Sequence, residues 1–161
     1  MTGAAQRPLL FLDVDGPLIP FGAGPYPPGS GPNPLLARVD PALGPRLGAL
    51  GCELVWATTW GEDANACVAP RLGLPELPLV PWPEVSEQDG RGGVHWKTPA
   101  LVAYARGRPF IWIDDEITEP DRAWVSAHHT GRALLHRVDP GVGLARADFG
   151  ALEAWLRPDP A

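Results

Sequence analysis

The sequence predicts an α/β fold in which a parallel sheet of about five strands is covered by helices on both faces. Short, almost uninterrupted apolar runs alternate along the chain with segments of helical character, which is typical of parallel strands buried on both faces. Glycine and proline, 19 and 21 of the 161 residues, are spread between these runs as turn residues. Right-handed crossovers between such strands give a three-layer, Rossmann-like, doubly wound arrangement.

Five apolar runs are the predicted strands. They cover residues 8–12, 53–57, 77–80, 110–113 and 132–136. The third run contains Pro78, which has no N–H to donate, so we expect this strand at an edge of the sheet.

The predicted helices lie between and after these strands. They cover residues 40–51, 62–72, 98–106, 119–128 and 148–156. Asp40 followed by Pro41 is typical of a helix start, and Gly73 and Gly107 are expected to end the second and third helices. Asp148 is expected to cap the last helix.

The chain length fits one domain. We expect residues 1–161 to form a single unit with its core over residues 8–157, because no repeat or linker interrupts the pattern. Residues 16–34 are too rich in glycine and proline for a regular helix. A loop of this length inside a small domain is usually functional, so we interpret it as a flap.

Charge limits the choice of partner. Thirteen basic and nineteen acidic residues give a formal net charge of −6, which argues against tight, sequence-independent binding of nucleic acid. A nucleic-acid end stays open as a substrate if a local basic rim exists. The candidates for that rim are Arg71, Arg91, Arg106 and Arg108.

The chain shows no sign of an oxidising or membrane environment. Cys52 and Cys67 are too few for a disulfide framework and are expected to be reduced, structural thiols. The first residues lack the pattern of a signal peptide, and no run approaches the length of a membrane span. A soluble, cytoplasmic protein without a membrane partner is therefore expected.

Polar residues gather where the predicted strands end. Asp13 and Asp15 follow the first strand, and Asp114 and Asp115 follow the fourth. Thr58 and Thr59 follow the second strand, and Lys97, the only lysine in the chain, precedes a helix. In parallel α/β sheets ligands bind outside the carboxyl ends of the strands, so we expect these groups to converge there.

The converging residues favour a phosphate and a metal ion. Four carboxylates in one cleft repel each other strongly, so either some of them are protonated or a cation lies among them. Hard oxygen ligands without histidine or cysteine at ligand spacing favour Mg²⁺. Lys97 adds positive charge, Thr58 adds a hydroxyl, and backbone N–H groups at a helix start can hold an anion. The set suits phosphoryl transfer, which needs positioning and neutralisation of charge.

Four segments resemble the motifs of the haloacid dehalogenase superfamily. The segment from Leu10 to Leu18, containing Asp-Val-Asp-Gly, is similar to the first motif, and Val55-Trp56-Ala57-Thr58 is similar to the second. Lys97 matches the third motif and Trp112-Ile113-Asp114-Asp115 the fourth. The order and spacing of the motifs match over about residues 8–157.

The resemblance implies a role for each matching residue. Asp13 is the nucleophile that forms an aspartyl-phosphate, and Asp15 is the acid–base partner. Thr58 and Lys97 hold the phosphoryl oxygens. Thr59 is the alternative to Thr58, which is favoured because it directly follows the strand, and Thr59 then contributes only its backbone N–H. Mg²⁺ is held by the Asp13 carboxylate, the Asp15 backbone carbonyl, and Asp114 or Asp115. Asp115 is as well placed to cap the following helix as to bind the metal.

The resemblance also narrows the reaction. The dehalogenases of the superfamily lack an acid at the place of Asp15, and its transport ATPases have threonine there, so Asp15 implies a phosphatase or phosphomutase. The intervals between the motifs leave no room for a large cap domain. An open site favours a macromolecular substrate, such as a nucleic-acid end or a phosphoprotein, or closure by a partner.

Several functions remain open. The Trp-Ala-Thr-Thr-Trp string and the paired aspartates are similar to small bacterial members associated with RNA repair, and the pair also resembles the phosphatase half of polynucleotide kinase-phosphatases. From the converging polar residues and from what the resemblance implies for Asp15, we expect a phosphomonoester hydrolase. A nucleic-acid end-processing phosphatase, a phosphomutase and a non-catalytic binding module are the alternatives.

The remaining aromatic and histidine residues receive structural roles. The tryptophans expected in the core are Trp56, Trp112, Trp124 and Trp155. Trp60, Trp82 and Trp96 fall in loops near the predicted site, where packing under the loops is favoured over stacking on a substrate. His95 is expected to be a bystander. Structural roles are expected for His128, His129 and His136.

Overall fold

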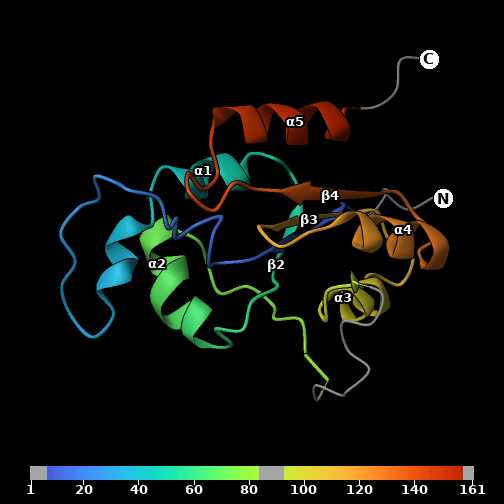
Figure 1. The fold of residues 1–161 in the computed structure, drawn as a ribbon, viewed down its shortest axis with the longest axis horizontal. Helices are drawn as coiled ribbons and strands as arrows, with labels where there is room; N and C mark the ends of the chain where they lie inside the picture. The colour runs from blue at the N-terminus through green and yellow to red at the C-terminus, as the bar shows by residue number, and fades with distance from the viewer. Residues whose placement is uncertain (1–6, 84–92, 158–161) are drawn as a thin grey trace.

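The computed structural model describes residues 7–83 and 93–157. Strands and helices alternate along the chain, as Figure 1 shows. The elements in order are β1 (Leu9–Leu12), the 3₁₀ helix η1 (Pro34–Arg38), α1 (Leu43–Gly48), β2 (Glu53–Trp56), the π-helix η2 (Ala64–Val68), α2 (Ala69–Leu72), α3 (Thr98–Ala105), β3 (Phe110–Asp114), α4 (Glu119–His128), β4 (Ala133–Arg137) and α5 (Arg146–Leu156).

All four strands run parallel, in the order β2-β1-β3-β4. Leu10 of β1 lies opposite Leu54 of β2 on one side and Ile111 of β3 on the other. Every residue of β1 and β3 is buried, and apart from Asp114 at the end of β3 these two strands are entirely apolar. The two central strands therefore bring their carboxyl ends together in the middle of the sheet.

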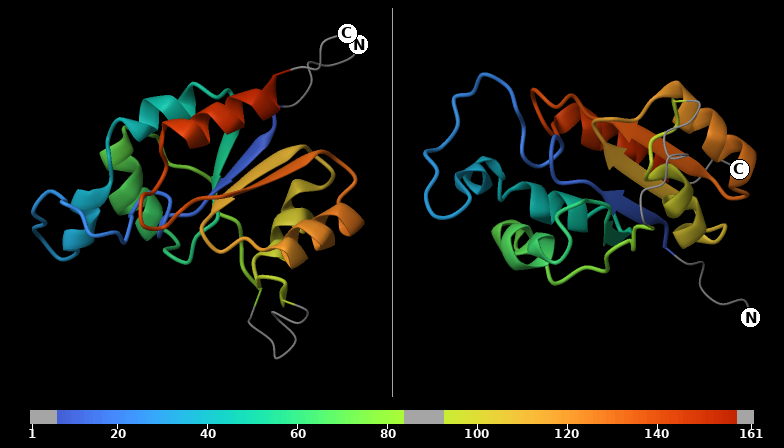
Figure 2. Two further views of the ribbon diagram at one scale, coloured as in Figure 1. Left: turned by 45° about the horizontal axis from the view of Figure 1, so that its top comes forward. Right: turned by 60° about the horizontal axis from the view of Figure 1, so that its bottom comes forward.

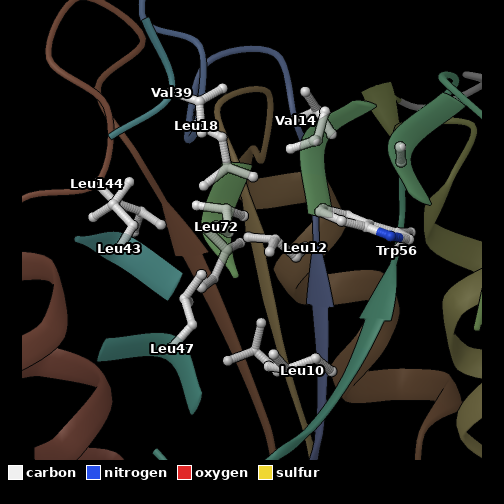
Figure 3. Close-up of a cluster of buried hydrophobic side chains, with 14 of the residues drawn as sticks. Leu10, Leu12, Val14, Leu18, Val39, Leu43, Leu47, Trp56, Leu72 and Leu144 are labelled. Carbon is white, nitrogen blue, oxygen red and sulfur yellow. The ribbon is translucent and has the colours of Figure 1, made fainter. Parts of the chain in front are cut away.

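Helices cover both faces of the sheet, as expected. On one face Leu10 and Leu12 pack with residues of α1, η2, α2 and α5, including Leu47 (Figure 3). On the other face Leu9 and Phe11 pack with residues of α3 and α4. Figure 2 shows the result, with α1 and α5 on one side of the strands and α3 and α4 on the other. Burying a large apolar side chain contributes about 2 kcal/mol, so these two clusters dominate the stability of the fold.

The prediction of a strand over residues 77–80 was wrong. Leu79 forms only an isolated parallel bridge with Trp56, so the described residues contain four strands and not five. The Trp56 N–H donates to the Pro78 carbonyl at 2.9 Å, and the Val80 N–H donates back to Trp56 at 3.0 Å. The segment does lie beside β2 at the sheet edge, but Pro78 and Pro81 have no N–H with which to extend the ladder.

Two predicted helix starts were also wrong. The helix expected from Asp40 begins at Leu43, because the Asp40 carboxylate accepts the Ala42 N–H at 2.9 Å in a turn that precedes it. Asp148 is not the cap of α5 but its third residue, from which its carboxylate accepts the Ala145 N–H at 2.7 Å.

The other helices agree with the sequence pattern more closely. α4 covers the predicted residues Glu119–His128. The helix predicted over residues 62–72 contains a π-helical turn before Pro70, a residue that cannot donate to the preceding turn. No helix among the described residues is long and apolar enough to cross a membrane.

The segment predicted as a flap is irregular and is tied to the rest of the chain by hydrogen bonds. The Leu144 N–H donates to the Pro17 carbonyl at 2.9 Å. The Arg38 guanidinium donates to the Pro20 carbonyl at 2.8 Å, and the Phe21 N–H donates to the Pro140 carbonyl at 2.7 Å. Figure 1 shows this segment, in blue, looping out beyond the helices before the chain returns at η1. The flap is thereby anchored to the loop that follows β4.

Candidate active site

Parallel pairing brings the predicted residues to one edge of the sheet. The Asp13 N–H donates to the Ile113 carbonyl at 3.1 Å, and the Ala57 N–H donates to the Leu12 carbonyl at 2.8 Å. These bonds continue the ladders beyond the ends of the strands. Asp13 after β1 is thereby held between Asp114 at the end of β3 and the segment that follows β2.

Lys97 lies at the centre of the site. Its Nζ is 3.2 Å from Asp13 Oδ1 and 2.9 Å from Asp114 Oδ2, and it donates to the Ala57 carbonyl at 2.8 Å. All three side chains are buried. The ammonium therefore joins the segments that follow β1, β2 and β3.

Three carboxylates form a cluster that fits a divalent cation. One oxygen from each of Asp13, Asp114 and Asp115 lies within 4.8 Å of the others. Trp112 Nε1 donates to Asp114 Oδ2 at 3.2 Å and the Glu116 N–H donates to Asp114 Oδ1 at 3.1 Å, which fixes the Asp114 carboxylate. Hard oxygen donors of this kind can hold a divalent cation.

The electrostatics of the site point to a shortage of positive charge. Burial raises the pKa of Asp13 to about 8, because lost hydration and the neighbouring Asp114 outweigh the attraction of Lys97. Burial, a hydrogen bond with Asp114 and the charge of Asp114 raise the pKa of Asp115 to about 6. Burial alone would lower the pKa of Lys97, but Asp13 and Asp114 raise it overall. A cation bound among these carboxylates would favour their charged forms.

Gly16 is required for the close approach of Asp115. A Cβ atom at Gly16 would lie 2.7 Å from Asp115 Cγ, nearer than real Cβ atoms come to a neighbour. The residue also has a φ of +98°, which side chains rarely adopt. The glycine that follows Asp15 in the sequence therefore brings the β1 loop against the end of β3.

Asp15 lies in the same pocket but outside the carboxylate cluster. Its Oδ2 accepts a hydrogen bond from Trp60 Nε1 at 3.2 Å. The pocket has a volume of about 520 Å³ and is lined by Asp13, Asp15, Phe21, Thr59, His95, Trp96, Lys97, Asp114, Asp115 and Glu116. Of the four aspartates predicted at the metal, the structure groups the side chains of Asp13, Asp114 and Asp115, and it places the Asp15 carboxylate on the pocket wall.

The two threonines after β2 lie differently. Thr59 is exposed and lines the pocket. Thr58 is buried, and its hydroxyl accepts the Trp60 N–H at 3.2 Å, which leaves the hydroxyl hydrogen free to donate. Asp115 does not cap α4, because Thr118 holds that position.

His95 is not a bystander, contrary to the prediction. Its Nδ1 accepts the Lys97 N–H at 3.1 Å, so the ring proton lies on Nε2 and points to Glu116 Oε2 at 2.7 Å. The imidazole thus fixes the backbone of Lys97 and joins it to the loop after β3. The short spacing between His95 and Lys97 in the sequence was the available signal for this contact.

Asp121 is a positioning residue that the sequence pattern did not reveal. Its side chain is buried in the first turn of α4. Oδ1 accepts the His95 N–H and the Thr98 hydroxyl, each at 2.7 Å, and Oδ2 accepts the Thr118 N–H at 2.9 Å. The residues on both sides of Lys97 are therefore fixed by one carboxylate. No local signal separates Asp121 from an ordinary residue at a helix start.

The loop tryptophans surround the site and mostly pack beneath it. Trp60 packs against the core and bonds Asp15, and Trp82 Nε1 donates to the Thr58 carbonyl at 3.0 Å. Trp96 meets Trp82 edge to face, with ring centroids 4.9 Å apart, and lines the pocket. Among the core predictions, Trp56 and Trp112 are fully buried, and the partly buried ones, Trp124 and Trp155, pack against the two clusters.

Of the four arginines considered for a basic rim, the three that the structure describes do not line this pocket. Arg106 and Arg108 line a larger hollow of about 900 Å³ between the Pro81–Pro83 segment and α3, together with Trp82 and Tyr104. That hollow contains none of the carboxylates. Arg71 lies on α2, and Arg91 lies outside the described residues.

The comparisons with known proteins add no assignment. No protein-family model, no curated protein and no solved structure matches the sequence. The functional argument therefore depends on the residues and geometry of the pocket.

Proposed function

We propose that the chain is a Mg²⁺-dependent phosphomonoester hydrolase of the haloacid dehalogenase type, with a Rossmann-like core. The single observation that supports this most is Lys97, the only lysine, buried between Asp13 and Asp114 at the carboxyl edge of the sheet. Burying an ammonium between two carboxylates adds little to stability as a rule, because the lost hydration offsets the attraction, so a functional role explains its presence better. Holding a dianionic phosphoryl group beside a metal ion is such a role.

The aspartates divide the chemistry between them. An oxygen of Asp13 attacks phosphorus, the bond from phosphorus to the leaving oxygen breaks, and Asp15 protonates that oxygen. Asp15 then takes a proton from water, whose oxygen attacks the aspartyl-phosphate and releases phosphate and Asp13. Lys97 and the N–H and hydroxyl groups after β2 hold the phosphoryl oxygens.

The side chains that would bind the metal differ from the one that acts as the acid. Asp13, Asp114 and Asp115 would hold Mg²⁺, which offsets the charge of the phosphoryl group. The bond from Trp60 keeps the Asp15 carboxylate away from that cluster, on the pocket wall where a leaving group would lie. An acid that is free of the metal can exchange a proton with the leaving oxygen.

The alternatives receive less support from the site. A phosphomutase needs a cover under which its substrate turns, and the described residues form one sheet with its helices. For a nucleic-acid end, none of the described arginines lines the pocket. A non-catalytic module would not need Asp15 held apart from the carboxylate cluster.

Hydrolysis of an aryl phosphate with and without Mg²⁺ tests the proposal. We expect metal-dependent release of phosphate by the wild type and loss of at least about a thousandfold in Asp13→Asn, because a carboxamide is not a competent nucleophile. Asp63→Asn is the matched control, since Asp63 is exposed and lies outside the pocket. Absence of turnover combined with absence of Mg²⁺ binding by calorimetry would leave a non-catalytic module.

A further inference from the structure

The wall of the catalytic pocket is strongly acidic. Among the described residues it holds five carboxylates, those of Asp13, Asp15, Asp114, Asp115 and Glu116, and a single lysine. Even with Asp15 protonated as the acid, the other four carboxylates outnumber the positive charges that Mg²⁺ and the Lys97 ammonium bring. One phosphoryl dianion bound at the metal would be attracted by both of these positive charges. A second anionic group on the substrate would then be repelled by carboxylates that no cation neutralises.

Glu116 places part of this negative charge at the outer rim. Its side chain is 65% exposed, and its only ion pair among the described residues is with His95. His95 Nε2 lies 2.7 Å from Glu116 Oε2, so the imidazole orients this carboxylate at the rim of the pocket. A leaving group that extends outward from phosphorus would pass this carboxylate.

Aromatic rings form the rest of the outer wall. Phe21 comes from the flap and is 52% exposed although its backbone is fixed to Pro140. Trp96 lines the pocket and is braced edge to face by Trp82. An exposed aromatic side chain on an anchored backbone is a typical contact for a flat apolar group.

No arginine of the described residues lines the acidic pocket, although Arg137 lies close behind it. Arg137, at the end of β4, uses its Nε to donate to the Asp115 carbonyl at 3.2 Å and lines a separate hollow with Val138, Asp139 and Pro140. The described part of the chain therefore offers no guanidinium inside the pocket for a second phosphate.

We propose that the substrate is the phosphate monoester of a phenol. The phenol, which is the leaving group, carries no negative charge on its substituents and preferably a positive one. This inference rests on the proposed function, because it names the substrate class of the same site. Phe21 and Trp96 contact the ring, and Glu116 selects its charge. A nucleic-acid end, with its anionic backbone, is disfavoured by the same carboxylates.

Three aryl phosphates that differ only in a distant charge test the proposal. The phosphates of tyramine, tyrosol and 3-(4-hydroxyphenyl)propionate present a cation, a neutral hydroxyl and an anion at the same distance from similar phenols. At low ionic strength we expect kcat/KM to fall in that order, with about a tenfold range between cation and anion. In Glu116→Gln the range should shrink several-fold, whereas the exposed control Glu76→Gln should leave it unchanged. Phe21→Ala should lower kcat/KM for all three alike.

Binding separates this inference from the proposed function. Non-hydrolysable benzylphosphonates with the same three substituents can be titrated into the Mg²⁺-loaded protein by calorimetry. The same order of affinity without turnover of any phosphate would support the charge selection by Glu116 and refute the proposed hydrolase. An anionic compound that binds or reacts best, or a range that does not respond to Glu116→Gln, would overturn the inference while hydrolysis continues. A single-stranded oligonucleotide 5′-phosphate preferred over the tyramine ester would overturn it as well.

Discussion

Replacing Lys97 with methionine removes the only buried positive charge between Asp13 and Asp114. Methionine is unbranched and similar in length, so the packing changes little. The variant leaves two buried carboxylates facing each other and the Ala57 carbonyl without its donor. Breaking a buried ion pair typically costs about 3 to 5 kcal/mol. The raised pKa of Asp13, about 8, lets that carboxyl take up a proton at neutral pH, which places the expected loss near the lower limit.

This loss is measurable by thermal and urea unfolding. In EDTA at pH 7.5 we expect Lys97→Met to lose about 3 kcal/mol and about 6 to 12 °C in Tm, given the usual scaling for a chain of this size. The deficit should shrink at pH 5, which is well below the pKa of about 8 of Asp13. Mg²⁺ at a hundred times its Kd should return about 2.7 kcal/mol, provided that the carboxylates still bind it.

The control for this experiment is Arg71→Met, which removes an exposed cation on α2 outside the pocket. We expect a change within about 0.5 kcal/mol. A Lys97→Met protein as stable as the wild type in EDTA at pH 7.5 would refute the charge balance described here. A destabilisation that Mg²⁺ does not reduce would show that the carboxylates do not form the metal site.

Three further outcomes follow from the same geometry. The pKa values of Asp13 and Asp115 are raised from 3.8 to about 8 and about 6, so the folded protein holds more protons than the unfolded chain between these pH values. Without metal, the free energy of unfolding measured in urea should therefore fall as pH rises from about 4 to about 8. Saturating Mg²⁺ should flatten that slope. Gly16→Ala should lower the free energy of unfolding by at least about 1 kcal/mol and weaken the Mg²⁺ binding measured by calorimetry, because the new methyl group displaces Asp115. The control is Gly48→Ala in α1, where a Cβ atom would have nothing within 4 Å, and it should be neutral or slightly stabilising. Asp121→Asn should lower kcat, because the residues on both sides of Lys97 lose a charged hydrogen-bond acceptor. With the single lysine selectively labelled with ¹⁵N, its side-chain NMR signal should also move. An unmoved signal would show that Asp121 stabilises only the start of α4.

The position of the site could be predicted because it depends on chain topology. Asp13 and Asp114 end neighbouring parallel strands, and a residue after such a strand can only lie at the carboxyl edge of the sheet. Lys97 was detectable as the only lysine of an acidic chain. The helix over Glu119–His128 was predicted with its bounds, and the structure shows Thr118 as its cap with Pro120 in its first turn.

Other features depend on contacts that leave little trace in the pattern. The run at residues 77–80 has the apolar character of a strand, but its prolines reduce it to one bridge beside Trp56. Asp121 acts through backbone N–H groups of a distant segment, and backbone donors are the same in every sequence. Asp148 was assigned to the wrong position in α5 because a carboxylate near a helix start can serve as the cap or bond back from the third residue.

The phosphoryl group on Asp13 is the most direct test of the central claim. We would mix Asp15→Asn with an aryl phosphate and Mg²⁺, quench the mixture in acid, and locate the modified residue by peptide mass spectrometry. We predict one phosphoryl group on the peptide that contains Asp13, its absence in EDTA, and its absence when Asp13 is also changed to asparagine. Turnover by the wild type with a phosphoryl group trapped on another residue, or with no trapped species in Asp15→Asn, would contradict the account.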